Sequence, residues 1–157
     1  MSVPVRVALT ITLAGAAVLA ISPFLPWATG DAVVASFTET GIDAGWGWAT
    51  VAVGAAAAVV AVLAVLAAQR GALRPVWLLF LALALVAGAV TAYEFTAVRG
   101  SLRDAHSQAT FSFGEGLSVD ALTTSYGVGL YLAAVGSGIL LVAALVWRTA
   151  VRRQPAA

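Results

Sequence analysis

The 157-residue sequence has no cysteine, no lysine and one histidine, His106. Without cysteine the chain cannot form disulfides, thiolate metal sites or iron–sulfur clusters. One histidine cannot supply bis-histidine haem ligation, nor the several His or Cys ligands of a typical Zn²⁺ site. No nucleophile elbow is present either. We therefore expect a non-enzymatic protein with no cofactor and no metal.

Charge is scarce as well. Charged residues make up 10% of the chain and hydrophobic residues 62%, against about 25% and 45–50% in soluble domains. So few charges cannot cover a soluble surface, which makes lipid the solvent for much of the chain. The net charge of +1 gives no reason to expect a nucleic acid partner.

Four apolar stretches occupy most of the sequence, at about 7–27, 46–68, 76–98 and 126–147. Each has roughly 20 residues, enough for a helix to cross about 30 Å of hydrocarbon. The run from Ala55 to Val60 lacks the alternation of a barrel strand. The sequence predicts an all-α integral membrane protein, a four-transmembrane-helix bundle forming one membrane domain over residues 1–157, with the lipid bilayer as partner.

Arginine is segregated from the acids. The segments before the first span, between the second and third, and after the fourth hold six arginines and no acid: Arg6, Arg70, Arg74, Arg148, Arg152 and Arg153. The other two loops, about 28–45 and 99–125, carry six acids and two arginines. The positive-inside rule then places both termini in the cytoplasm and the acidic loops outside. All five tryptophans fall near predicted span ends, as expected for interfacial rings.

The N-terminus has a second interpretation. A short basic start, an apolar run and Val18-Leu19-Ala20 resemble a cleaved signal peptide. The apolar run continues to Trp27, which is longer than such a peptide usually has, so we expect a retained span. Cleavage would leave three spans with the same orientation.

The two outer loops contain segments with strand character. Val33 to Thr38 has β propensity, and alternation over Thr110 to Phe113 places both phenyl rings on one face. These segments could pair into a small extracytoplasmic sheet, or both loops could be irregular. The start of the second loop, 99–108, could instead extend the third helix.

Glycine spacing suggests an internal repeat. Gly45, Gly47, Val53 and Gly54 open the second span, and the same spacing opens the fourth, at Gly127, Gly129, Val135 and Gly136. Two tandem helical hairpins would give this pattern.

Small residues four apart, typical of close helix contacts in lipid, make Gly54, Gly88, Gly129 and Ala133 the candidate packing positions. We expect Gly88→Leu or Gly129→Leu to destabilise the bundle.

Glu94 is the acid closest to the interior of a span. It lies about 27 Å along the third helix, which places it near the outer interface. It is either an ion- or proton-binding carboxylate at an outer vestibule, or an interfacial acid that is hydrated or paired with Arg99 or Arg103. The sequence favours the second interpretation, because Glu94 lies near the outer interface and not near the centre of the span.

Tryptophans gather at the predicted outer interface. Pro23 and Pro26 must end or bend the first helix, and Trp27 follows them. Trp46 and Trp48 begin the second span. The simplest role for this turn is structural; a groove lined by the three indoles, for a lipid tail or a partner helix, is the alternative.

Pro26-Trp27 after the first span and Gly45-Trp46 before the second resemble small actinobacterial four-span membrane proteins, among them the family of tryptophan-biosynthesis-associated membrane proteins. The resemblance covers most of the chain in topology and only these two motifs in sequence. It implies a plasma-membrane location and supplies no catalytic residues.

Three functions compete. The sequence favours a non-catalytic protein of the bacterial cell envelope that acts by contact, as an accessory or assembly subunit or scaffold, with a larger membrane protein or a second copy as partner. An oligomeric small transporter or channel would use a thin polar lining such as Thr91 and Ser137, with Glu94 at its mouth. A lipid-binding or lipid-modifying protein would need Asp104, Glu115 and Asp120 to converge at the membrane surface.

Overall fold

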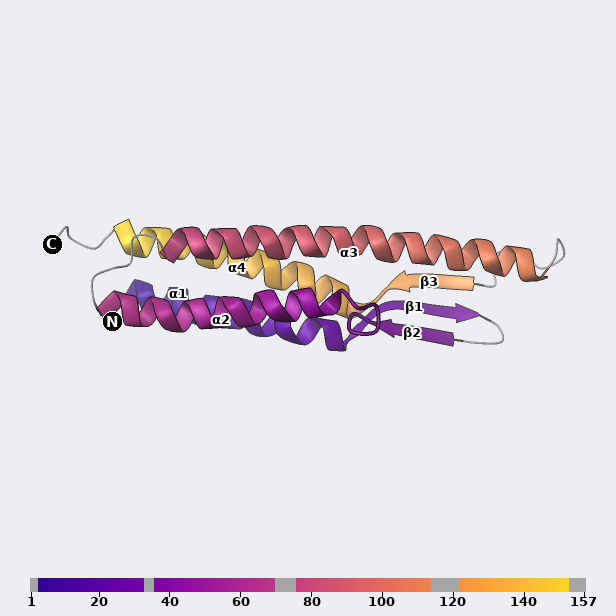
Figure 1. Cartoon of the computed structure of the whole chain (residues 1–157), viewed down its shortest axis with the longest axis horizontal. Helices are drawn as coiled ribbons and strands as arrows, with labels where there is room; N and C mark the ends of the chain where they lie inside the picture. The colour runs from indigo at the N-terminus through magenta and orange to yellow at the C-terminus, as the bar shows by residue number, and fades with distance from the viewer. Residues whose placement is uncertain (1–2, 33–35, 70–75, 114–121, 153–157) are drawn as a thin grey trace.

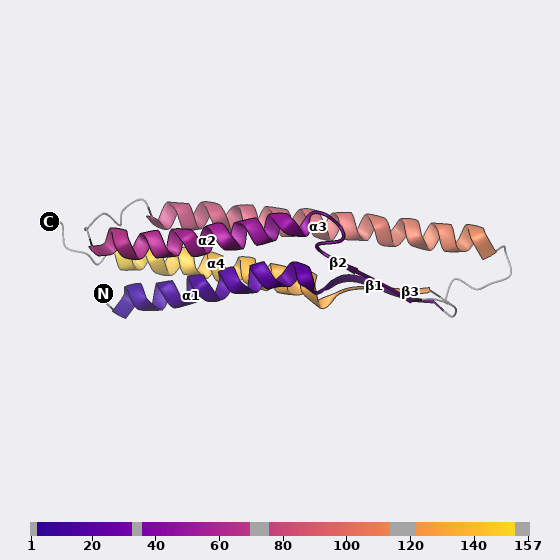
Figure 2. The same ribbon diagram turned by 60° about the horizontal axis from the view of Figure 1, so that its bottom comes forward.

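The computed structural model describes residues 3–32, 36–69, 76–113 and 122–152. These form the helices α1 (Val3–Ile21), α2 (Gly47–Gln69), α3 (Val76–Phe113) and α4 (Val128–Arg152), a 3-10 turn η1 (Ser22–Phe24), and the strands β1 (Pro26–Ala32), β2 (Ser36–Thr40) and β3 (Leu122–Tyr126). The helices lie side by side in an elongated bundle with the strands at one end (Figure 1). We call this the sheet end, and the opposite end, where α1 begins and α4 finishes, the terminal end (Figures 1 and 2).

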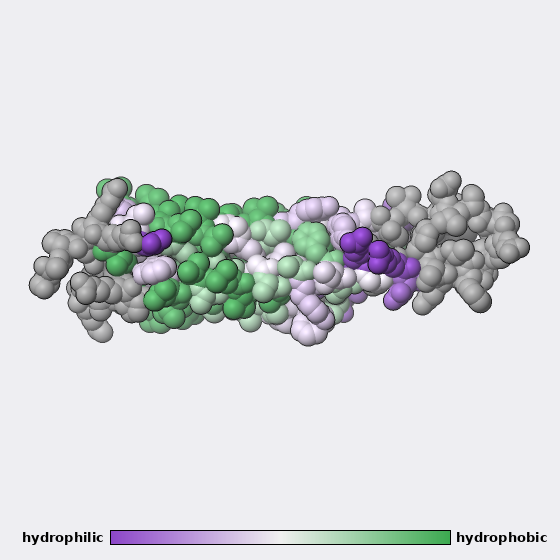
Figure 3. Space-filling view, turned by 90° about the horizontal axis from the view of Figure 1, so that it is seen from above, coloured by the Kyte–Doolittle hydropathy of each residue, from purple (hydrophilic) through white to green (hydrophobic). Residues whose placement is uncertain are grey.

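All four helices are long and apolar enough to cross a membrane, as the sequence predicts. Large apolar side chains such as Leu63, Leu85 and Leu145 are more than half exposed on the bundle. They form an apolar surface between the two ends (Figure 3). A surface of this extent needs a lipid solvent, because soluble monomers rarely expose large contiguous apolar patches.

α1 begins at Val3 and α4 ends at Arg152, a few residues beyond the predicted spans, and two boundaries at the sheet end also differ from the prediction. α1 ends at Ile21, and Trp27 belongs to β1 rather than to the first span. Tyr126 belongs to β3, and α4 starts at Val128. Both changes have one cause: β1 and β3 pair directly above the bundle, with Ala28 opposite Tyr126. α1 therefore ends earlier, and α4 begins later, than hydropathy suggests.

The third helix is much longer than its predicted span. α3 has 38 residues, and its membrane-crossing part covers Val76–Gly100. The remainder to Phe113 extends about 20 Å further, past the other three helices (Figure 1). The extension of this helix into the loop is confirmed, and the strand predicted at Thr110 to Phe113 is wrong. Four alternating residues are too short a pattern to stop a helix already propagating through helix-permissive sequence.

A three-stranded antiparallel sheet in the order β2-β1-β3 lies beside this extension. The predicted small sheet is therefore present, with β3 in place of the second predicted strand. Of the first predicted strand, Val33 to Ala35 lie outside the described residues and Ser36 to Thr38 lie in β2. The ring of Phe37 covers Gly30 on the neighbouring strand, where an added Cβ would overlap the ring. Thr29 Oγ1 lies 2.9 Å from Ser125 Oγ on the other side of β1.

Helix α1 packs against both α2 and α4. A Cβ at Gly54 of α2 would lie 2.8 Å from the carbonyl oxygen of Ala16, and one at Gly136 of α4 would lie 2.9 Å from Leu19 Cγ. The matching glycines of the proposed repeat thus both meet α1. Two equivalent hairpins would instead bring Gly136 against α3, the partner of α4 in its own hairpin. The shared spacing is explained by packing on a common helix.

The other predicted packing residues have different surroundings. A Cβ at Gly129 would lie 2.5 Å from the carbonyl oxygen of Ser22 and 2.6 Å from Trp27 Cδ1, so α4 begins in close contact with the turn after α1. Ala133 is fully buried. Gly88 has no described atom within 4 Å of its Cβ position. The expected close approach is absent there, because Gly88 does not lie on the face of α3 that packs through Ala84 and Ala87. We therefore no longer expect Gly88→Leu to destabilise the bundle.

The core at the terminal end contains a tryptophan, where the sequence predicts an interfacial ring. Trp147 is fully buried, stacks on Phe80 with ring centroids 5.4 Å apart, and donates from Nε1 to Thr12 Oγ1 at 3.1 Å. The amphipathic indole explains the misassignment, since it can sit at an interface or, with its N–H satisfied, in a core. Nearby, the guanidinium of Arg148 lies 5.5 Å from the ring centroid of Trp77.

Candidate functional site: a buried carboxyl at the sheet end

Glu94 is buried inside the bundle. Only 1% of the residue is exposed, and its Oε1 has no hydrogen-bond partner among the described residues. Arg99 and Arg103, the partners considered for it, are exposed on α3. The expectation of a hydrated or arginine-paired interfacial acid is therefore wrong. The position of a residue along a helix predicts its height in the membrane. The face of the helix on which it lies decides whether it is exposed or buried among the other helices.

The residues on either side of Glu94 show how α3 turns it inward. The ring of Tyr93 meets Trp46, just before α2, with centroids 5.3 Å apart. The ring of Phe95 meets Tyr126 of β3 at 5.5 Å and Tyr131 of α4 at 6.1 Å. Successive helix residues point about 100° apart, so contacts on both flanks direct Glu94 between them, toward the interior.

A buried pair of hydroxyls lies one turn from Glu94 toward the terminal end. Thr91 Oγ1 of α3 and Ser137 Oγ of α4 are 3.2 Å apart. Each also donates within its own helix, Thr91 to the carbonyl of Ala87 at 2.8 Å and Ser137 to that of Ala133 at 2.9 Å. Each hydroxyl has only one proton to donate. To donate to the hydroxyl of the other helix, Thr91 or Ser137 must therefore give up its hydrogen bond to the carbonyl of its own helix. The pair can therefore rearrange its hydrogen bonds without moving a helix.

An apolar cluster lies one turn from Glu94 in the other direction. Val98 of α3 packs in one cluster with Trp27 and Ala28 of β1 and with Leu130 of α4. Trp27 is 1% exposed, and its Nε1 donates to the carbonyl oxygen of Ser22 at 2.9 Å. The interfacial anchor predicted at Trp27 is wrong, because the indole is buried against Gly41, which follows β2, and against Gly129 of α4. Glu94 lies between this cluster and the hydroxyl pair.

The chemistry open to Glu94 follows from its surroundings. A bare carboxylate in an apolar interior is very costly, and even a neutral polar group loses about 1–3 kcal/mol when it lacks a partner. The group must therefore carry a proton, bind a small cation, or accept a hydrogen bond from a group that reaches Oε1. In membrane proteins, buried acids of this kind mark proton and ion sites.

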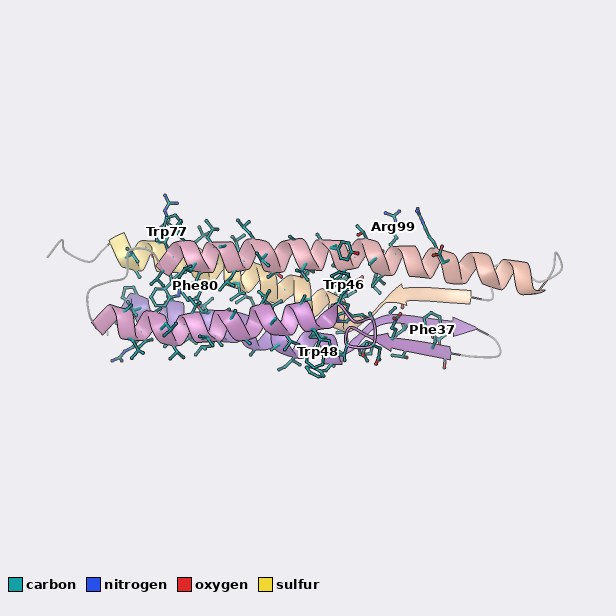
Figure 4. All side chains as sticks on the ribbon, in the orientation of Figure 1. Phe37, Trp46, Trp48, Trp77, Phe80 and Arg99 are labelled. Carbon is teal, nitrogen blue, oxygen red and sulfur yellow. The ribbon has the colours of Figure 1, made fainter. Side chains whose placement is uncertain are left out.

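The three tryptophans of the predicted groove do not form one surface. Trp46 and Trp48 are 55% and 58% exposed, whereas Trp27 is in the core. Trp46 points toward α3 and Trp48 points to the opposite side of α2 (Figure 4). Because the two rings lie on opposite sides of α2 (Figure 4), they could not line one groove.

The other acids and the histidine do not assemble a described site. Asp104 and His106 belong to the extension of α3. Glu115 and Asp120 lie outside the described residues. Within residues 3–32, 36–69, 76–113 and 122–152, no group of three or more His, Cys, Asp or Glu side chains could hold a metal ion.

One signal in the sequence could have located the buried carboxyl. Ala87, Thr91, Glu94 and Val98 follow one another at intervals of four, three and four residues, which places them on one helix face. All four are buried. A lone acid that shares its helix face with three small or apolar residues is therefore expected to point into the bundle.

No protein-family model matches the chain, and no curated protein matches its sequence.

Proposed function

We propose that this chain is a non-catalytic membrane protein that acts by contact, holding a folded module outside the bilayer for a partner protein. The module consists of the three strands and the part of α3 beyond Gly100. The single observation behind the proposal is the length of α3, which continues from the membrane span into the module without a break. A continuous helix holds the module in a fixed position relative to the membrane.

The module offers an edge to a partner. β2 is an outer strand of the sheet, and Ser36, Phe37 and Thr38 on it are exposed. An outer strand presents unpaired backbone groups, to which a partner can add a strand. We place the chain in a bacterial plasma membrane. The arginine distribution supports an orientation with both termini in the cytoplasm, which turns the sheet end to the outside.

The test is photocrosslinking in living cells from Thr38 on β2, with Leu145 on α4 as the matched control. Both positions are exposed. Thr38 lies in the module, and Leu145 lies on the apolar surface between the two ends of the bundle. We expect a discrete protein adduct from Thr38 and only lipid adducts from Leu145. Mass spectrometry of the adduct identifies a larger partner or a second copy. Lipid alone from both positions would refute the proposal.

Glu94 supports a second candidate function, proton or small-cation transfer by an oligomer. Its buried Oε1 has no described partner, and the Thr91–Ser137 hydroxyl pair lies one helix turn away toward the terminal end. Purified protein in sealed vesicles with an internal pH dye tests this function. Proton flux that Glu94→Gln abolishes, and that Glu39→Gln on the sheet leaves intact, would establish it. Wild-type vesicles as tight as empty ones would exclude it for protons.

A further inference from the structure

We propose that the exposed face of α3 binds an anionic phospholipid, with Arg99 and Arg103 holding the headgroup phosphate. The contact proposed above is at the edge of β2 and uses neither arginine, although Arg103 lies on the part of α3 that belongs to the module. Both are exposed, and four residues apart on a helix they share one face. Their two like charges therefore lie close together on this face.

The same helix face continues into the membrane as an apolar strip. At alternating intervals of four and three residues from Arg103 lie Arg99, Thr96, Ala92, Ala89 and Leu85, all of them exposed. Leu85 to Thr96 spans about 16 Å, close to one leaflet of a hydrocarbon core about 30 Å thick. An acyl chain can therefore lie along the strip with its headgroup at the arginines.

Helix geometry aims the arginines at the headgroup level. Side chains on a helix lean toward its N-terminus, and the N-terminal direction of α3 is the direction of the membrane span. Arg99 projects from α3 on the side away from the strands (Figure 4). Seen from above, a strongly hydrophilic patch borders the apolar surface (Figure 3). Tyr93, about 9 Å before Arg99 along α3, and its neighbour Trp46 are half-exposed rings of the kind that settle at an interface.

The chemistry selects an anionic lipid. A guanidinium matches a phosphate with two parallel hydrogen bonds. A zwitterionic lipid brings its own cation beside that phosphate, whereas phosphatidylglycerol brings none. Asp104 follows Arg103 but points about 100° further around the helix, so it does not share the face of the two arginines. An acidic partner protein would satisfy the charges, but it would leave the apolar strip unexplained.

The test uses purified full-length protein in nanodiscs that contain photoactivatable phosphatidylglycerol or phosphatidylcholine with the same acyl chains. Crosslinks are mapped to peptides by mass spectrometry. We expect phosphatidylglycerol to label Leu85 to Thr96 preferentially. Each arginine near a membrane surface contributes about 1 kcal/mol, so Arg99→Gln with Arg103→Gln should weaken the labelling about 30-fold.

Matched controls separate the alternatives. Arg6→Gln with Arg148→Gln removes the same charge at the terminal end and should leave labelling of this strip unchanged. Equal labelling by both lipids, or full labelling of the Arg99/Arg103 double variant, would overturn the proposal. Competition by soluble glycerol phosphate would assign the site to a free phosphate ligand. Labelling in nanodiscs that disappears in native membranes would assign the arginines to a protein partner.

Discussion

The close approach of α1 and α2 can be tested with two chemically identical substitutions, Gly54→Ala and Gly88→Ala. A Cβ at Gly54 would lie 2.8 Å from the carbonyl oxygen of Ala16 and 3.1 Å from the amide nitrogen of Ala20. At Gly88 nothing described lies within 4 Å. Alanine is the right probe because the position of Cβ is set by the backbone and no rotamer can avoid the contact.

The magnitude follows from two terms. In a helix interior, alanine is more favourable than glycine by about 0.8–1 kcal/mol, and this gain applies to both variants. At Gly54 the new methyl group meets backbone atoms, so the helices must separate, at a cost of about 1–3 kcal/mol. We therefore expect Gly88→Ala to stabilise the bundle by up to about 1 kcal/mol. Gly54→Ala should be about 1–3 kcal/mol less stable than Gly88→Ala.

The assay is unfolding by sodium dodecyl sulfate added to protein in a mild non-ionic detergent, followed by far-ultraviolet circular dichroism. Each midpoint is compared with wild type under the same micelle composition, so the difference between the two variants cancels the shared helix-propensity gain. If Gly54→Ala unfolds at the same or a higher denaturant fraction than Gly88→Ala, the inferred contact between α1 and α2 is wrong.

Three further predictions concern other parts of the fold. Trp147→Phe and Thr12→Val should each destabilise the bundle, and a double-mutant cycle should give a coupling of about 1 kcal/mol from their hydrogen bond. Gly30→Ala should speed amide hydrogen exchange in β1, because the new methyl group displaces the ring of Phe37, and adding Phe37→Ala should partly restore protection. Thr38→Cys should react with a membrane-impermeant maleimide in intact cells if the sheet end faces outward.

Each of these three has its own control. Additive single effects in the double-mutant cycle would show that the indole and the threonine do not interact. Unchanged exchange in β1 after Gly30→Ala would show that the ring does not lie over the glycine. For the labelling, Thr149→Cys at the terminal end should react only after the cells are opened, and the chain has no cysteine of its own to give a background. The reverse pattern would invert the proposed orientation.

The sequence alone was sufficient to identify the four membrane helices. Their apolar runs are long, and a helix in lipid must satisfy its own backbone groups, so the outcome depends on local composition. The close contacts at Gly54 and Gly129 were also predictable, because helices in lipid approach where side chains are small. Gly88 has the same small-residue spacing without the contact, since spacing does not say which face meets a neighbour.

The tertiary structure decided the remaining features, because they depend on residues distant in the chain. β3 pairs with β1 across almost one hundred positions, with Thr29 beside Ser125, and no local pattern determines such a pairing. That pairing places Trp27 in β1 rather than in the first span, and the indole packs in one cluster with Val98 of α3 and Leu130 of α4. The orientation of Glu94 follows from the contacts of Tyr93 and Phe95 on its two flanks. The sequence determined that an acid lies at this depth, and the packing of three other elements around α3 determined that it is buried.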